Sequence, residues 1–448
     1  MGCMLNYDKI VKYHVEAACA EPLHIGNAVG SKDEVLIHPI DRIPFIQASG
    51  IAGIFRQYYR NSYDDGKTEI LFGKSLGEDA ESSRIRFTDG IFTSRDCFQL
   101  ELRPRVSIDP VTGTNRSSMI KGTGYRAGHK FNMEYISAGS EFNFDIYLYL
   151  NDEIKEAEWE LEDMIVAVKN HSLQFGGQKS NGCGYVDIKS LGKISFDMKK
   201  KSDRELWYRE HTLKKEAYTT VELSTESRLE KAFVISLTGK TENALLVKGI
   251  SSLEYHEKTP DAVPMMNGQG EYIIPGSSFK GAIRSQMEKI ARYLHCDDVI
   301  EETFGSIGGE NGVGNISFCD TVIGTKEDND KVDPSHRIHI DKFTGGVMSG
   351  SLFDEKNSYG NLTLRISIAD RNHPKRSCAL LLLALRDLAA GALNLGSGFS
   401  VGKGFIDVDT IRITCPKSER EAVIQYHNNE VLDETCLVEE LLASLQRG

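Results

Sequence analysis

The feature that most constrains this chain is an internal repeat. The segment FIQASGIAGIFR at 45–56 matches IIPGSSFKGAIR at 273–284, which lies 228 residues further along. Five further pairs follow in the same order, at offsets between 218 and 232: ILFGKSLG (70–77) with ETFGSIGG (302–309), SSRIRFTDG (82–90) with GNISFCDT (314–321), SIDPVTG (107–113) with HIDKFTG (339–345), EFNFDIYLYL (141–150) with YGNLTLRISI (359–368), and NGCGYVDI (181–188) with VGKGFIDV (401–408). A period of this length is too long for a solenoid and indicates two copies of one domain.

Composition sets the class of protein that carries this repeat. The chain has 448 residues, 40% hydrophobic and 26% charged, which indicates a globular protein with more than one core. The sequence contains no run of eighteen apolar residues that would predict a membrane span, and its N-terminus lacks the pattern of a secretion signal. We therefore expect a cytoplasmic protein. The nine cysteines form no CxxC pair, which favours reduced thiols over a zinc cluster. The net charge of −12 argues weakly against a nucleic-acid partner, but it leaves room for a local basic groove.

Charge and periodicity predict the organisation of the chain. We expect a first domain at 1–198, a polar linker at 199–230, a second domain at 231–415 and an acidic tail at 416–448. Each copy opens with an alternating strand, reaches a helix, continues through strands and a long hairpin, and ends with a second helix, a glycine-rich turn and a last strand. This is the split βαβ order of a ferredoxin-like α+β fold, which RNA-recognition (RRM) modules also use.

The motifs of the second copy carry a family resemblance. The second copy combines the helix motif IIPGSSFKGAIR, an aspartate in the preceding loop, the sequence TFG, the hairpin HRIHIDKFTGG and the late turn LGSGFSVGKGF. Together these motifs resemble the backbone subunit of type III CRISPR RNA-guided effector complexes, in the RAMP superfamily. The first copy is similar but degraded, since Gln47 replaces the motif proline and Ala52 stands where Lys280 stands. The resemblance implies two tandem RAMP domains, each with an inserted thumb hairpin.

The helix entry PGSSFKGAIR has the pattern of a phosphate cradle. Its glycine and serines would present N–H groups and hydroxyls at the positive end of the helix dipole, and its lysine and arginine lie four residues apart on one face. The alternative is a capped helix with a solvated basic face. The glycines of the late turn would let the backbone approach RNA closely, or would simply form a flexible connection. The predicted RNA-binding residues are Ser49, Arg56, Gly276, Ser277, Ser278, Lys280, Arg284, Gly396, Gly398, Lys403 and Lys179.

Asp33 and Asp261 are the catalytic candidates. Each lies in the loop after the first strand, and each precedes the second glycine of its helix motif by twenty residues. The resemblance implies that this aspartate serves cleavage of target RNA that depends on Mg²⁺ or another divalent cation. A carboxylate near a scissile phosphate either holds such an ion or helps deprotonate the 2′-hydroxyl, and the alternative is an aspartate that caps a turn. Because His24, His38 and His256 show no metal-binding spacing, we expect no metal site built by the protein alone.

The paired hairpins are the thumb candidates. In the family resembled, this hairpin wedges between guide and target bases and exposes a scissile phosphate, whereas the alternative is an ordinary type I turn. Its histidines are interpreted as phosphate contacts or solvated side chains, with general acid–base chemistry as the alternative. The predicted thumb residues are Asp109, Thr112, His336, Arg337, His339, Asp341 and Phe343.

The sequence thus predicts a guide-RNA-binding backbone subunit that cleaves complementary single-stranded target RNA at two sites, one per domain. Two alternatives stay open: a non-catalytic guide-RNA scaffold, and an endonuclease that processes precursor CRISPR RNA. The resemblance implies the CRISPR guide RNA, the complementary target RNA, other RAMP backbone subunits and the large subunit of the complex as partners. A head-to-tail filament would make such neighbours obligatory.

Overall fold

The computed structural model describes residues 7–26, 33–63, 65–74, 81–109, 117–119, 126–128, 130–224, 231–250, 260–306 and 312–447. The chain forms two compact units. Unit 1 comprises Met1–Leu100, Tyr135–Lys179 and Cys183–Glu230, and unit 2 comprises Glu101–Glu134, Ser180–Gly182 and Lys231–Gly448. Each unit has its own hydrophobic core, one drawn from each sequence copy. The predicted tandem α+β organisation is therefore confirmed. None of the described helices is both long and apolar enough to cross a membrane.

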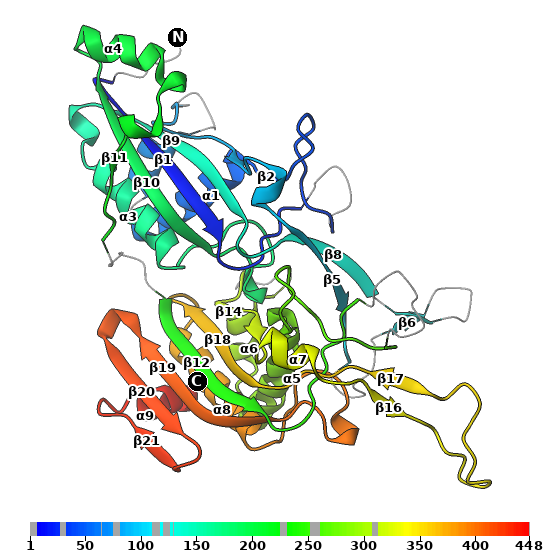
Figure 1. Cartoon of the computed structure of the whole chain (residues 1–448). Coiled ribbons are helices and arrows are strands. Elements are labelled where there is room, and N and C mark those ends of the chain that lie inside the picture. The colour runs from blue at the N-terminus through cyan, green and yellow to red at the C-terminus, as the bar shows by residue number, and fades with distance from the viewer. Residues whose placement is uncertain are drawn as a thin grey trace. The chain divides into compact units, whose positions relative to one another are not determined.

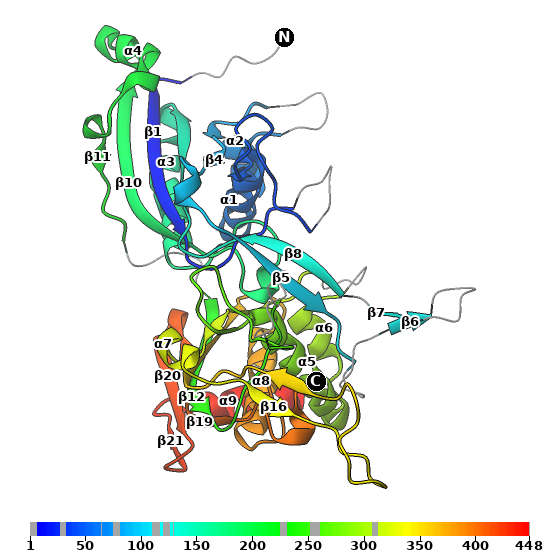
Figure 2. The same cartoon turned by 45° about the vertical axis from the view of Figure 1, so that its right-hand side comes forward.

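Unit 1 is an antiparallel sheet covered by helices. Its elements are β1 (Lys9–Cys19), β2 (Phe45–Ile46), α1 (Ala48–Ser62), α2 (Asp65–Phe72), β3 (Ile85–Phe87), β4 (Gly90–Ile91), β9 (Glu141–Leu150), α3 (Ala157–Lys169), β10 (Val186–Asp197), α4 (Lys201–Tyr208) and β11 (Thr219–Thr220). The strand order is β11-β10-β1-β9-β4-β2, and β3 also pairs with β9 (Figure 1). Val11, Tyr13 and Val15 of the central strand enter the core, which lies on the side of α1 and α3 (Figure 2).

Unit 2 repeats this plan and extends it. Its elements are β12 (Lys231–Thr241), β13 (Ile273–Ile274), α5 (Gly276–Leu294), α6 (Asp298–Phe304), β14 (Ile316–Phe318), β15 (Thr321–Val322), α7 (Lys326–Asp330), β16 (Ser335–Arg337), β17 (Phe353–Glu355), β18 (Asn361–Ala369), α8 (Pro374–Ala389), β19 (Ile406–Cys415), β20 (Arg420–Gln425), β21 (Glu430–Leu432) and α9 (Leu437–Ala443). The strand order is β14-β18-β12-β19-β20-β21. The matching runs β3-β9-β1-β10 and β14-β18-β12-β19 both have the ferredoxin-like order.

Two segments that were predicted to lie outside the domains are parts of them. Within 199–230, β11 pairs with β10, Trp207 packs edge-on against Phe196 with ring centroids 5.3 Å apart, and Glu210 binds the buried ammonium of Lys12 (2.6 Å). Within 416–448, β20 and β21 extend the sheet, and Leu437 and Leu441 of α9 are buried. The polar composition of these segments predicts a linker and a tail, but a few well-spaced apolar residues are enough to anchor each segment to its domain.

The hairpins are inserted before β9 and β18. In the first copy β5 (Leu100–Val106) pairs with β8 (Lys130–Ile136), and β6 (Ser117–Met119) pairs with β7 (Arg126–Gly128). In the second copy β16 pairs with β17, and Figure 1 shows this hairpin projecting from the body of unit 2. Most of the first hairpin belongs to unit 2, because Glu101 and Arg103 are buried there with Asp320. The division of the chain therefore differs from a single boundary near 198.

The ends of the apolar helix α8 are set by a proline at its start and a glycine just beyond its end. The sequence predicts a helix over 377–393, and the structure has one over Pro374–Ala389. Proline suits the first turn because its missing N–H has no partner there in any case. The chain turns away at Gly391, whose φ of 70° lies in the left-handed region.

Candidate functional site

Helix α5 begins at the motif for which the sequence predicts a phosphate cradle. Its first N–H, from Gly276, donates to Oδ1 of Asp320 (2.8 Å). The N–H groups of Ser278 and Phe279 donate to the carbonyl of Pro275 (2.9 and 3.2 Å). These groups are therefore satisfied within the protein, which differs from the expected row of unpaired N–H groups and matches the alternative of a capped helix.

The first copy builds the same helix start from different residues. The N–H of Ala48 donates to Oδ1 of Asp89 (2.7 Å), and the next turn donates to the carbonyl of Gln47 (2.9 and 3.1 Å). Gln47 thus supplies the acceptor that proline supplies in the second copy. Gly276 is needed for close approach, since a Cβ there would lie 2.0 Å from the carbonyl oxygen of Phe318.

Positive charges gather further along α5. Lys280 donates from Nζ to Oγ of Ser180 (2.7 Å). Burial, followed by the charges of Arg284 and Arg105, lowers the pKa of Lys280 to about 8. Arg284 remains partly exposed and pairs with Glu288 (2.8 Å). An anion that arrives at this cluster would relieve the repulsion among the three cations, so the cluster is suited to phosphate.

The late turn of the second copy folds back onto its own unit. Gly396 has a φ of 80°, and a Cβ there would lie 2.5 Å from the carbonyl oxygen of Leu246. Lys403 is buried and donates to Oε2 of Glu355 (2.5 Å) and Oδ1 of Asn357 (2.7 Å). Its charge therefore compensates a buried carboxylate at the base of the hairpin. The sequence predicts an RNA contact at Lys403, and the structure shows its ammonium already engaged by two side chains of unit 2.

The remaining predicted RNA contacts are spread over both copies. Arg56 is exposed and donates to the carbonyl of Gly73 (3.2 Å). Ser49 is exposed on α1, and Ser277 is half-buried on α5. Lys179 is half-buried in unit 1, whereas Gly398 of unit 2 has a φ of 89°. Within unit 2, α5 carries Ser277, Lys280 and Arg284 together.

Asp261 lies at the base of the second hairpin. Its side chain is exposed, and Oδ2 accepts the backbone N–H of Asp354 in β17 (2.9 Å). Ala262 donates to the carbonyl of Asp354 (3.1 Å) and accepts from the N–H of Lys356 (2.9 Å), so the loop attaches to the edge of β17. Asp33 occupies the corresponding loop of unit 1 and is half-buried in a turn. The loop aspartate of the second copy is thus held against the hairpin with its carboxylate open to solvent.

A histidine stands opposite the residue that binds Asp261. His336 of β16 is the cross-strand partner of Asp354, and its Nδ1 lies 2.7 Å from Oδ1 of that residue. The neighbouring Arg337 pairs with Glu355 (3.2 Å), which also receives Lys403. The hairpin base therefore brings acidic side chains (Asp354 and Glu355) together with cationic or proton-binding ones (His336, Arg337 and Lys403) beside the loop aspartate.

The hairpin tip is a tight turn closed by an aspartate. Oδ1 of Asp341 accepts the N–H groups of Thr344 (2.8 Å) and Phe343 (2.9 Å), and these bonds lower the pKa of Asp341. This local bonding is what the alternative of an ordinary turn leads one to expect at the hairpin tip. Phe343 is 98% exposed at the same tip. The turn therefore presents an aromatic ring to the solvent.

The loop between β16 and β17 is unusually apolar for an exposed segment. Its exposed large apolar side chains are Ile338, Ile340, Phe343, Val347, Met348 and Leu352. His339 is exposed among them. In the first hairpin Asp109 is half-buried, and Thr112 lies outside the described residues. Exposed apolar patches on an otherwise charged protein mark contact surfaces.

Asp261 offers one exposed carboxylate to a metal ion. The described part of the chain contains no group of three or more His, Cys, Asp and Glu residues that could hold a metal. The exposed carboxylate of Asp261 fits one ligand position, and a hard cation such as Mg²⁺ would take its other oxygens from RNA phosphates and water.

Comparison with known proteins places the chain in a family. A family model described as the RAMP superfamily matches residues 17–187 and 259–407, which together exceed half of the chain. The chain belongs to the RAMP superfamily. One RAMP region falls in each sequence copy. A similar solved structure is the "Cryo-EM structure of the Type III-B Cmr-beta bound to cognate target RNA", with 19% identity, a TM-score of 0.30, and coverage of 42% of this chain and 61% of that chain. The match thus spans less than two thirds of that chain. Comparison with curated proteins finds no match.

Sequence reasoning missed the aspartates that anchor the two RAMP helix starts. Asp89 and Asp320 occupy the same place in the aligned segments RIRFTDG and NISFCDT, so the repeat itself contained the signal. Asp354 was also missed. Its contact with Asp261 joins segments 93 residues apart, and no local pattern predicts such a contact.

Proposed function

We propose that this RAMP protein is a guide-RNA-binding backbone subunit of a type III CRISPR effector complex, and that each of its domains cuts complementary target RNA once. The observation that carries the proposal is the position of Asp261. Its exposed carboxylate is fixed to the base of a projecting hairpin that ends in an exposed phenylalanine. The presence of a RAMP region in each copy supports a corresponding role for Asp33.

RNA binding rests on the cation cluster of α5. Lys280 and Arg284 lie one helical turn apart, and the proximity of Arg105 adds to the local positive field. Because such contacts release counterions, the affinity for guide RNA would fall steeply with salt. The acidic net charge of the whole chain does not oppose this, since screening limits the field to about 10 Å at ordinary ionic strength.

The residues of the hairpin would prepare the cut. An exposed ring such as Phe343 can stack on a base and so interrupt a duplex that lies along the hairpin. An unstacked nucleotide can place its 2′-oxygen in line with the adjacent phosphate, which a stacked duplex prevents. The N–H of Asp354 holds the carboxylate of Asp261 in place, and this contact would orient it toward the reacting nucleotide. A divalent cation bound at this carboxylate would neutralise charge on the phosphate.

Single-turnover cleavage by the assembled complex tests the proposal. The substrate is a labelled RNA complementary to the guide, and the readout is the set of product bands together with guide and target affinities. We expect Asp261→Ala to remove one band with both affinities intact, and Asp328→Ala, at an exposed aspartate of α7, to change nothing. Loss of every band together with affinity would show that Asp261 is structural. Unchanged bands would favour the non-catalytic scaffold.

A further inference from the structure

The base of the second hairpin holds a histidine and a carboxylate in the arrangement of an oriented base. Nδ1 of His336 lies 2.7 Å from Oδ1 of Asp354, and the two residues face each other across β16 and β17. An ionised carboxylate can only accept hydrogen bonds, so Nδ1 carries the proton in this contact. The other ring nitrogen, Nε2, is then the atom that can accept a proton. The His336 side chain is 67% exposed, which leaves it accessible to RNA.

The same residue that orients His336 also binds the loop aspartate. The backbone N–H of Asp354 donates to Oδ2 of Asp261 (2.9 Å), while its side chain holds the imidazole. The backbone carbonyl of Asp354 accepts from Ala262 (3.1 Å), which fixes the loop on the strand edge. A single residue thus connects the proposed catalytic carboxylate of Asp261 to a proton-accepting side chain.

We propose that His336 is the general base of the second cleavage site, oriented by Asp354. This rests on the proposed function. Nε2 takes the proton of the 2′-hydroxyl, the 2′-oxygen forms a bond to the adjacent phosphorus, and the bond from phosphorus to the 5′-oxygen breaks. The leaving 5′-oxygen takes a proton from water, and the imidazolium returns its proton to solvent. The products are a 2′,3′-cyclic phosphate and a 5′-hydroxyl.

Charged groups from each neighbouring segment surround this pair. Asp354 faces the ring from β17, and the loop contributes Asp261. Beside His336 on β16, Arg337 pairs with Glu355, which Lys403 also neutralises. The acidic and basic groups are therefore largely paired.

The first copy offers an internal reference. At the hairpin offset of 232 residues, Pro104 stands where His336 stands, although Arg105 and Asp109 match Arg337 and Asp341. A proline has no side chain that can accept a proton. The two sites would therefore differ in their dependence on this position.

The experiment is single-turnover cleavage by the assembled complex, with the two cuts resolved and followed separately from pH 5 to 8. We expect His336→Ala to slow the Asp261-dependent cut by about 100-fold to 10,000-fold, to remove a rise of its rate with pH, and to leave the other cut and both RNA affinities unchanged. Added imidazole should restore part of the lost rate. Asp354→Asn keeps the backbone contact to Asp261 but loses the ionised acceptor, and it should slow the same cut.

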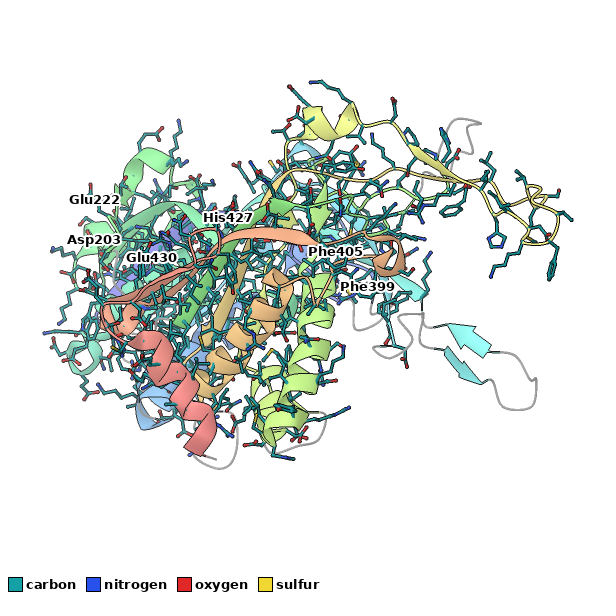
Figure 3. All side chains as sticks on the ribbon, turned by 90° about the horizontal axis from the view of Figure 1, so that it is seen from below. Asp203, Glu222, Phe399, Phe405, His427 and Glu430 are labelled. Carbon is teal, nitrogen blue, oxygen red and sulfur yellow. The ribbon has the colours of Figure 1, made fainter. Side chains whose placement is uncertain are left out.

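A second exposed histidine–aspartate pair in unit 2 supplies the matched control. His427, in the turn between β20 and β21, lies 2.8 Å from Asp409 and is 58% exposed (Figure 3). His427→Ala should leave both cuts unchanged. If His336→Ala cleaves like the wild type while Asp261→Ala does not, the general-base role is wrong and the proposed function stands. If His336→Ala weakens target binding and both cuts equally, the residue is an RNA contact. If the wild type makes neither cut, the proposed function fails and this inference fails with it.

Discussion

Replacing Asp320 by alanine removes two interactions at the start of α5. Oδ1 accepts the N–H of Gly276 (2.8 Å), and Oδ2 pairs with Arg103 (2.6 Å), whose side chain is 7% exposed. Loss of a helix cap costs about 1 kcal/mol, and a buried charge left without its partner costs about 3–5 kcal/mol. Because Arg103 keeps Glu101 as a second partner at 2.6 Å, the lower end of that range applies. We therefore expect Asp320→Ala to lower the free energy of unfolding by about 4 kcal/mol.

The first copy provides the comparison that isolates the ion pair. Asp89 accepts the N–H of Ala48 (2.7 Å) at the same place in its own domain, so Asp89→Ala should cost only the cap, about 1 kcal/mol. Urea unfolding of the full chain, followed by circular dichroism, measures both changes. Asp320→Asn keeps a cap acceptor and loses the charge, which separates the two contributions. If Asp320→Ala costs no more than Asp89→Ala, the buried pair with Arg103 adds nothing and the reasoning is wrong.

Three further changes test other parts of the account. The pKa of Lys280 is lowered to about 8, so the side chain loses its charge between about pH 7 and pH 9. Guide-RNA affinity, measured by filter binding, should therefore fall over that range. If the affinity of a Lys280→Arg variant falls in the same way, this explanation is wrong. Gly276→Ala would place a Cβ 2.0 Å from the Phe318 carbonyl and should cost about 1–3 kcal/mol in urea unfolding, whereas no cost would mean that the backbone adjusts freely. Lys403→Met removes one of the two cations that pair with the buried carboxylate of Glu355 and leaves only Arg337. The rate of amide hydrogen exchange in β17 should therefore rise. An unchanged rate would show that the Lys403 contact does not stabilise the hairpin base.

The repeat predicted most of the fold, because recurring apolar alternation locates the strands and helices along each copy. Their order along the chain is that of a ferredoxin-like domain. Both ferredoxin-like sheets and the helices α1 and α5 lie where the pattern places them. Average polarity assigns the segments 199–230 and 416–448 to a linker and a tail, although each contains an apolar cluster: Leu206, Trp207 and Tyr208 in the first, and Leu437, Val438, Leu441 and Leu442 in the second. The charged residues around these clusters outweigh them when a whole segment is judged by its average polarity.

The site was predictable in its residue types and less so in its partners. The motif identified Lys280 and Arg284 as a cationic pair, and the repeat identified the loop aspartates. It could not show that Lys403 is neutralised by Glu355, because that bond joins residues 48 positions apart. For the same reason the sequence left His336 as an isolated histidine, when a cross-strand aspartate holds it.

The most direct test of the two-module account compares Asp33→Ala, Asp261→Ala and the double variant in the assembled complex on one complementary RNA. Two catalytic domains on one chain predict that each single variant loses a different cut and that the double variant binds guide and target normally without making either. Both cuts persisting in the double variant at the wild-type rate would contradict the assignment of the loop aspartates to RNA cleavage.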